Sequence, residues 1–224
     1  MRDIVRAAEP PQLMIKFMGW NKALAAGAAT PTYPCLIDER HSLGALYGII
    51  NVPTAVWIDE AGHMVRAPEP PAVTDGFRSM DLQTFTIPRE LAEDSRLRRQ
   101  IYVDAVRDWV ENGAASRHVL PPDEVRRRMR GVSAGDSLAE AHFRLGLWLL
   151  RTGARDAART ALDEAVRLRP ESWRYRRQKI VLLEAGLTGQ LAATPEYWQA
   201  VQALGDDDYY PPIEMDGMPP PRRR

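Results

Sequence analysis

Thiol and imidazole groups are the side chains here whose types could support catalysis or metal binding. Cys35 is the only cysteine among the 224 residues, so the chain can form neither an intramolecular disulfide nor a dithiol pair. It follows a proline in an apolar run, away from the helix N-termini that lower thiol pKa values. We interpret Cys35 as a buried structural residue, and a reactive thiol at this position remains the alternative.

Spacing gives no support for a metal or a phosphate site. His41 and His63 do not stand at ligand spacing with Cys35, and no Ser/His/Asp arrangement is visible. Gly44 and Gly48 are too isolated to form a loop that cradles phosphate. The sequence therefore predicts no metal and no cofactor.

Composition is that of an ordinary globular protein. Hydrophobic residues make up 45% and charged residues 27%, and the formal net charge is zero, so the overall charge suggests neither nucleic acid nor a membrane as a partner. The first six residues include the charged Arg2, Asp3 and Arg6, where an export signal needs an apolar core, and no apolar run approaches bilayer length. We expect a cytoplasmic protein. Arginine far outnumbers lysine, which we attribute to genome base composition.

The N-terminal half carries signals for short helices and strands. Apolar residues between Leu13 and Ala25 recur at helical spacing, and residues 33–37 form a short apolar run. Residues 54–59 and 63–66 are rich in strand formers and are separated by a turn that ends in Gly62, which predicts a β-hairpin. Pro68 ends the second strand because proline cannot donate to a ladder.

From Thr86 onward the pattern is helical. Thr86 is the predicted N-cap of a helix with a buried stripe at intervals of four, and Asn112-Gly113 ends that helix. Pro121-Pro122 opens a shorter helix that ends in a run of arginines, which we interpret as matching the helix dipole. The stripe consists of Leu97, Ile101, Ala105 and Trp109.

A helix–turn–helix pattern follows. Small residues, Gly146 and Ala158, stand where two helices would cross, Gly153 supplies the turn, and Pro170 ends the second helix. These offsets resemble the 34-residue tetratricopeptide repeat. One repeat cannot cover both of its faces, so we expect a capping helix through Leu183 and a final helix near residues 195–204.

Residues 33–66 resemble the second half of thioredoxin-like proteins of the redoxin family. The matching features are Tyr33-Pro34-Cys35, Tyr47-Gly48, Val52-Pro53-Thr54 and Asp59-Glu60-Ala61-Gly62. The resemblance implies an α/β, incomplete thioredoxin-like part followed by an all-α, tetratricopeptide-like part. The expected domain boundaries are 1–85, 86–132 for connecting helices, 133–205 for the helical domain, and 206–224 for an irregular tail.

The resemblance also implies a site. In that family the proline equivalent to Pro53 is cis, and it faces a dithiol that performs thiol–disulfide exchange or peroxide reduction. Val52, Pro53 and Thr54 would then bind an extended peptide by strand addition. The residues before the matching segment contain no cysteine, so the nucleophile that the family requires is missing.

Two functional hypotheses follow. The first is a non-catalytic module for protein–protein interaction, in which the Val52–Pro53 edge or the helical part binds an unknown protein or peptide. The alternative is a truncated redoxin whose catalytic cysteine lies upstream of this chain. Because strand 54–59 would lack its neighbour in a thioredoxin sheet, self-association through that edge is a further expectation.

Overall fold

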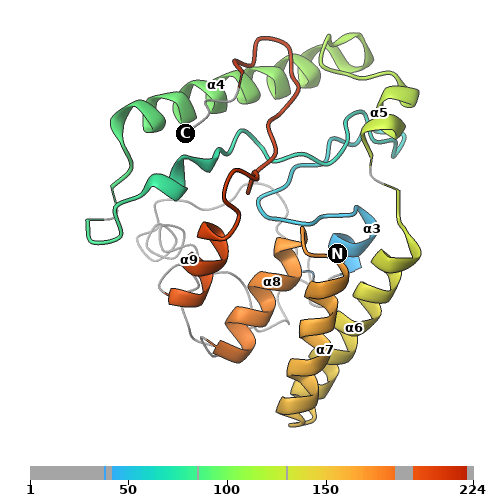
Figure 1. The fold of residues 1–224 in the computed structure, drawn as a ribbon. Helices are drawn as coiled ribbons and strands as arrows, with labels where there is room; N and C mark the ends of the chain where they lie inside the picture. The colour runs from blue at the N-terminus through green and yellow to red at the C-terminus, as the bar shows by residue number, and fades with distance from the viewer. Residues whose placement is uncertain (1–37, 39–41, 85, 130, 185–193, 221–224) are drawn as a thin grey trace, which may run out of the picture. The chain divides into compact units, whose positions relative to one another are not determined.

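The computed structural model describes residue 38 and residues 42–84, 86–129, 131–184 and 194–220. Within these ranges the chain is all-α, with no β-sheet (Figure 1). The helices are α3 (Ser42–Leu46), α4 (Arg89–Asn112), α5 (Pro122–Arg128), α6 (Ala134–Arg151), α7 (Arg155–Leu168), α8 (Trp173–Lys179) and α9 (Pro195–Gln202), with 3₁₀ turns η1 (Asp75–Ser79) and η2 (Gly113–Ala115) and a π-turn η3 (Ile180–Glu184).

The chain groups into two compact units that interleave along the sequence. Unit 1 combines residues 1–46 with 135–199, and unit 2 combines residues 47–134 with 200–224. In unit 2 the segment after α9 carries no helix or strand up to residue 220. It is nevertheless packed, because Tyr209 and Met215 are buried.

The thioredoxin-like α/β assignment is wrong, because the described residues contain no sheet. Residues 54–59 and 63–66 do run antiparallel, with isolated bridges at Ala55–Glu69 and Ile58–Met64, and Gly62 has the positive φ expected of the turn. The pairing then slips: Trp57 O accepts from Val65 N, but the next bonds join Ala55 and Glu69. One side therefore advances two residues while the other advances four, and no ladder continues.

Burial of a charged side chain accounts for this slip. Arg66 is 2% exposed and forms a two-pronged ion pair with Glu69, at 2.8 and 2.9 Å. The chain turns inward at Arg66 to reach this partner, which an extended strand does not allow. Two short runs without a third strand do not make a stable sheet, and the self-association argument, which required a sheet edge, no longer applies.

Helix α4 forms the largest element of unit 2, and its buried face matches the predicted stripe in part, because Ala105 is buried and Trp109 packs against the core. Leu97 is 54% exposed, whereas Arg98, Tyr102 and Ala105 are buried. The Trp57 ring stacks on Trp109 with centroids 5.0 Å apart. The helix also begins later than predicted, at Arg89 after Pro88.

Helices α6 and α7 form the predicted helical hairpin in unit 1 (Figure 1). Gly153 has φ +83, and its N–H donates to Leu150 O while Ala154 N–H donates to Leu149 O, the double bond of a Schellman turn. A Cβ on Gly146 would lie 2.6 Å from Leu162 Cγ. The predicted close approach of the two helices at Gly146 is confirmed.

The hydrophobic core of unit 1 lies between this hairpin and the elements that follow it. Phe143 and Tyr175 pack ring against ring, with centroids 4.8 Å apart. The predicted capping helix is present as α8 followed by η3, and α9 matches the predicted final helix. The buried residues of this core are Ala139, Phe143, Leu147, Leu162, Ala165, Tyr175, Leu182 and Leu183.

Candidate functional site

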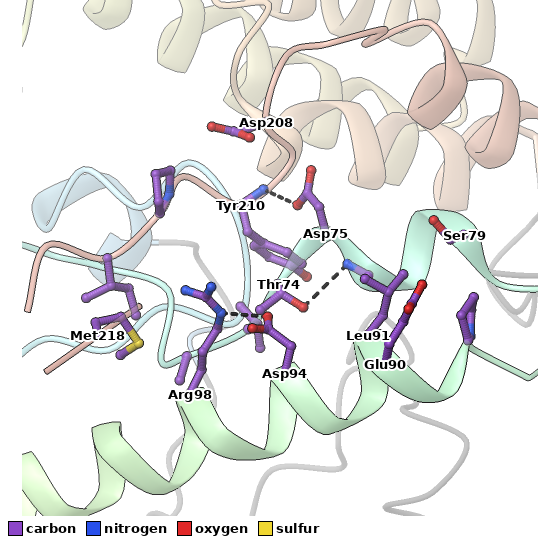
Figure 2. Close-up of a pocket in the computed structure, with 16 residues that line it drawn as sticks. Thr74, Asp75, Ser79, Glu90, Leu91, Asp94, Arg98, Asp208, Tyr210 and Met218 are labelled. Carbon is purple, nitrogen blue, oxygen red and sulfur yellow. Dashed lines mark hydrogen bonds and ion pairs between the residues drawn. The ribbon is translucent and has the colours of Figure 1, made fainter. Parts of the chain in front are cut away.

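A cavity of about 440 Å³ lies within unit 2, between the segment 72–79, the beginning of α4 and the C-terminal segment (Figure 2). Its volume falls in the range of small-ligand and side-chain pockets. The lining residues are Ala72, Val73, Thr74, Asp75, Gly76, Ser79, Pro88, Glu90, Leu91, Asp94, Arg98, Asp208, Tyr210, Pro212, Ile213 and Met218.

Helical periodicity explains the α4 contribution. Positions four apart lie one above the other on a helix, so Glu90, Asp94 and Arg98 share one face. Leu91 lies beside Glu90 on the same turn. The first turn of α4 thus presents a carboxylate and an apolar side chain to the cavity, and an acidic residue is favourable there because the helix dipole is positive at this end.

Asp75 holds the C-terminal segment against η1. Its two carboxylate oxygens accept hydrogen bonds from the backbone N–H groups of Tyr209 and Tyr210, both at 2.8 Å. Arg78 Nη1 donates to the same carboxylate at 3.1 Å and to Asp207 O at 2.8 Å. The Asp75 carboxylate therefore has a structural role, because its oxygens accept from the C-terminal backbone and pair with Arg78.

Arg98 and Asp94 form a second structural unit in the lining. Arg98 Nε lies 2.7 Å from Asp94 Oδ2, and the two side chains are 7% and 10% exposed. Arg98 also donates to Pro219 O at 2.9 Å and to Pro220 O at 2.7 Å. The positive charge in the lining is thus used to neutralise Asp94 and to bind the C-terminal backbone.

Glu90 and Asp208 differ from these residues. Both are exposed, and neither carboxylate forms an ion pair or hydrogen bond with the described part of the chain. Asp75 is paired with Arg78 and Asp94 with Arg98. The charges of Glu90 and Asp208 are not balanced in this way, so the described lining has a net negative charge. The lining also contains apolar side chains, among them Val73, Leu91 and Met218.

The described lining combines apolar side chains, carboxylates, one guanidinium group and hydroxyl groups. Ser79 lines the cavity, but neither histidine nor cysteine occurs among the described residues that line it. In the described part of the chain, no group of three or more His, Cys, Asp or Glu side chains is placed to hold a metal ion. The cavity therefore presents apolar side chains and two carboxylates for which the described residues supply no cation.

The residues expected to bind a peptide do not line this cavity. The Val52–Pro53 bond is cis, as the resemblance implied. Val52 O, which was expected to face an extended peptide, accepts a hydrogen bond from the Tyr210 hydroxyl at 3.0 Å. Thr54 Oγ1 donates to Asn51 O at 2.7 Å. Cys35 lies outside the described residues.

Sequence reasoning missed the cavity residues. The spacing of Glu90, Asp94 and Arg98 could have indicated a charged face on one helix. Asp208 ends a run of three aspartates, which gives no sign of the α4 residues that share the cavity. Their meeting depends on contacts between segments more than a hundred residues apart, which no local pattern encodes.

A neighbouring polar network in unit 2 is structural. Trp57 Nε1 donates to the Tyr102 hydroxyl at 2.7 Å, and Arg66 lies over the Trp57 ring. Burial, reinforced by the negative charge of Glu69, raises the pKa of Tyr102 above its ordinary value. The phenol therefore stays protonated at neutral pH and serves as a buried hydrogen-bonding group.

Comparison of the chain with protein-family models, curated proteins and solved structures finds no match. Together with the absence of a sheet in the described residues, this removes the redoxin assignment, and no family model supports a tetratricopeptide repeat. Among the helices that the structure describes, none has the length and apolar character needed to cross a bilayer.

Proposed function

We propose that this chain is a non-catalytic protein-interaction module and that the unit 2 cavity receives a segment of a partner protein. The observation that carries this proposal is the cavity itself, with an apolar wall and two carboxylates that no residue of the described chain uses. Every other charged group in the lining is engaged in holding the fold.

The surface beside the cavity supports a partner larger than a metabolite. Pro88 lines the cavity, and the preceding Ile87 is 38% exposed. Leu82, 43% exposed, belongs to the turn that Asp81 and Thr86 close by a bridge. An extended segment that entered the cavity could therefore meet further apolar surface at Ile87 and Leu82.

A peptide selection tests this function. Random 12-residue peptides displayed on phage are selected on the wild-type chain, and the enriched peptides are measured on Ser79→Trp, which places a large ring in the cavity at an exposed position. Leu97→Trp is the matched control, because Leu97 is exposed on α4 and does not line the cavity. We expect binding to the wild type and the control, and at least tenfold weaker binding to Ser79→Trp.

Two results would refute the function: no peptide enriched above the bare support, or enriched peptides that bind Ser79→Trp as tightly as the wild type. Circular dichroism establishes that both tryptophan variants are folded. Glu90→Trp, at the exposed start of α4, blocks the same cavity from the other side and repeats the measurement if Ser79→Trp does not fold.

A further inference from the structure

A buried histidine, His118, lies where three segments of unit 2 meet. Arg66 donates through Nη1 to His118 O at 2.9 Å and through Nη2 to Glu214 O at 3.1 Å. Leu120 N–H donates to Val65 O at 3.1 Å. This meeting point, the His118 junction, consists of residues 65–69, 116–120 and 214–218.

The surroundings of the His118 ring suit its neutral form. The residue is 4% exposed. Nε2 accepts from Arg117 Nε at 3.4 Å, since a guanidinium nitrogen can only donate, and a neutral ring that accepts at Nε2 carries its proton on Nδ1. Nδ1 is shielded from solvent and has no hydrogen-bond partner among the described residues. A second proton, added at Nε2, would end the bond from Arg117.

Two cations lie close to this ring. Arg117 is on its own segment and contacts Nε2, and Arg66 comes from the turn at residues 65–69 and contacts the His118 carbonyl. A protonated ring would be a third positive charge beside these two. Like charges away from bulk water repel one another, and burial alone already disfavours the charged ring.

The nearby carboxylates are engaged by other groups. Asp108 of α4 accepts from the Ser116 hydroxyl at 2.5 Å and from Asn112 Nδ2 at 2.9 Å. Asp216 of the C-terminal segment pairs with Arg117 at 3.1 Å. These two carboxylates favour a charged ring, against burial and the two arginines. The other carboxylates at the junction are Glu69, paired with Arg66, and Glu214, paired with Arg128.

We infer that the His118 junction is a pH-sensitive contact, in which the neutral ring keeps residues 116–120 and 214–218 on the turn at 65–69 and a proton on the ring releases them. The release would separate Arg66 from the carbonyls of His118 and Glu214. It would also move Met218, which lines the cavity. The inference does not depend on the proposed function, because it concerns how the chain holds its own C-terminal segment.

The direction of the pH effect follows from the two states of the ring. Burial, followed by the charge of Arg117, lowers the pKa of His118 below its ordinary value of 6.5. In the released segment the ring is hydrated and has the ordinary pKa. The junction is therefore complete above pH 6.5 and opens as the pH falls from there towards the folded pKa. Between pH 7.5 and 5.5 the released population should rise by up to about tenfold.

Amide hydrogen exchange of the full chain at pH 7.5 and 5.5, corrected for intrinsic rates, tests the inference. Leu120 and Met218 are the reporters, because their N–H groups donate to Val65 O at 3.1 Å and to Met215 O at 3.0 Å. We expect their protection factors to fall about three- to tenfold at pH 5.5. Ala105, buried within α4, should change less than twofold.

Histidine variants identify the group that titrates. His118→Gln cannot be protonated, so the protection of Leu120 and Met218 should agree within twofold at the two pH values. His63→Gln is the matched control, because the His63 ring is 77% exposed; it should keep the full fall. A fall below twofold in the wild type, or the same fall in His118→Gln, overturns the inference.

A ring titration keeps the test decisive if His118→Gln does not fold. The Hε1 resonance of His118 in the wild type should titrate with a midpoint below 6.5. Arg117→Gln, at a side chain 70% exposed, should raise this midpoint because it removes the nearest cation. Arg107→Gln, at a side chain 65% exposed, should not change it. A midpoint at or above 6.5, or equal midpoints in the two arginine variants, refutes the pH-sensitive contact.

The two proposals fail in different ways. The exchange and titration measurements use no partner, so a failed peptide selection does not affect them. If protection at the His118 junction does not change with pH while selected peptides still need the open cavity, the interaction function stands and the pH-sensitive contact is wrong.

Discussion

Arginine side chains of this protein donate to backbone carbonyls, most of which lie outside the helices. A guanidinium presents five donors in a rigid fork, which lysine cannot reproduce. The excess of arginine over lysine therefore has a structural use that composition alone did not reveal. The arginines that donate to backbone carbonyls are Arg66, Arg78, Arg98, Arg128, Arg155 and Arg176.

Arg98→Lys tests this use of the fork. Lysine keeps the charge but cannot reach Asp94, Pro219 O and Pro220 O together, so buried acceptors lose their donors. We expect the free energy of unfolding to fall by about 2–3 kcal/mol in urea denaturation. Arg89→Lys is the control, because Arg89 is 92% exposed in its pair with Glu93; it should stay within about 0.5 kcal/mol. Equal effects of the two substitutions would contradict the argument.

Glu140 predicts an acid-sensitive contribution to the stability of unit 1. Burial raises its pKa, but the hydrogen bond from Arg144 and the charge of Arg174 outweigh burial, so the pKa is lowered overall. The carboxylate also accepts from the Tyr175 hydroxyl at 2.8 Å. A lowered pKa gives stability that is complete above the ordinary value of 4.5 and is lost as the pH falls through the folded value.

Glu140→Gln should therefore lower the free energy of unfolding by about 3 kcal/mol at pH 7, because Arg174 stays buried without its anion. The difference from the wild type should shrink as the pH falls below 4.5. Urea unfolding at pH 7, 5, 4 and 3 measures both quantities. A difference that does not change with pH would show that the charge of Glu140 is not involved.

At the scale of elements, the close contact between α6 and α7 is the most specific feature. Gly146→Ala would place its Cβ 2.6 Å from Leu162 Cγ and 2.7 Å from Leu162 Cδ2, and Leu162 is buried. Overpacking costs about 1–3 kcal/mol, against a gain in helix propensity of up to about 1 kcal/mol. We expect a net loss of about 1–2 kcal/mol in thermal or urea unfolding.

Two further variants identify the cause of that loss. In a Leu162→Ala background, Gly146→Ala should cost nothing, because the clashing atoms are gone. Gly131→Ala should stay within about 0.5 kcal/mol, because nothing lies within 4 Å of a Cβ built there. If Gly146→Ala costs as much without the Leu162 side chain as with it, the contact is not the reason.

Local patterns predicted helices well and the N-terminal fold badly. The hairpin of α6 and α7, the turn at Gly153 and the helix opened by Pro122 follow from spacing, capping and breaker residues, which act within a few positions. The α4 stripe was right in part: Ala105 and Trp109 pack into the core, whereas Leu97 is exposed. Tyr102 is buried because it packs against Trp57, which comes from a distant segment that spacing along the helix does not show.

The candidate site could not be predicted from local patterns for a related reason. Glu90 and Asp208 line the same cavity only because Asp75 and Arg98 bind the C-terminal backbone beside η1 and α4. The strand signals of residues 54–66 were real, since the two runs do approach each other. The pairing slips at the buried Arg66–Glu69 pair, a side-chain interaction that strand propensity does not register.

At the scale of the molecule, unit 2 depends on residues from both ends of its sequence. Ending the chain after Gly205 would remove the buried Tyr209 and Met215 and leave Asp75 and Arg98 without their backbone partners. Hydrogen exchange should then lose the protection of α4 amides while the α6–α7 hairpin keeps its own. Ending the chain after Pro220 retains every C-terminal contact described above and should preserve α4 protection. Full protection of α4 in the shorter chain would contradict this dependence.

Because residues of unit 1 lie between the two parts of unit 2 in the sequence, the two units cannot be completed in the order in which they begin. A nascent chain can present α4 and residues 47–84 outside the ribosome long before the aspartates and tyrosines at 206–210 have been translated. During that interval Asp75, Arg66 and Arg98 must be hydrated or held by a chaperone, whereas α6 and α7 can pair as soon as they emerge. Completion of unit 2 is therefore expected to wait for the synthesis of residues 206–220, with the intervening helices already folded.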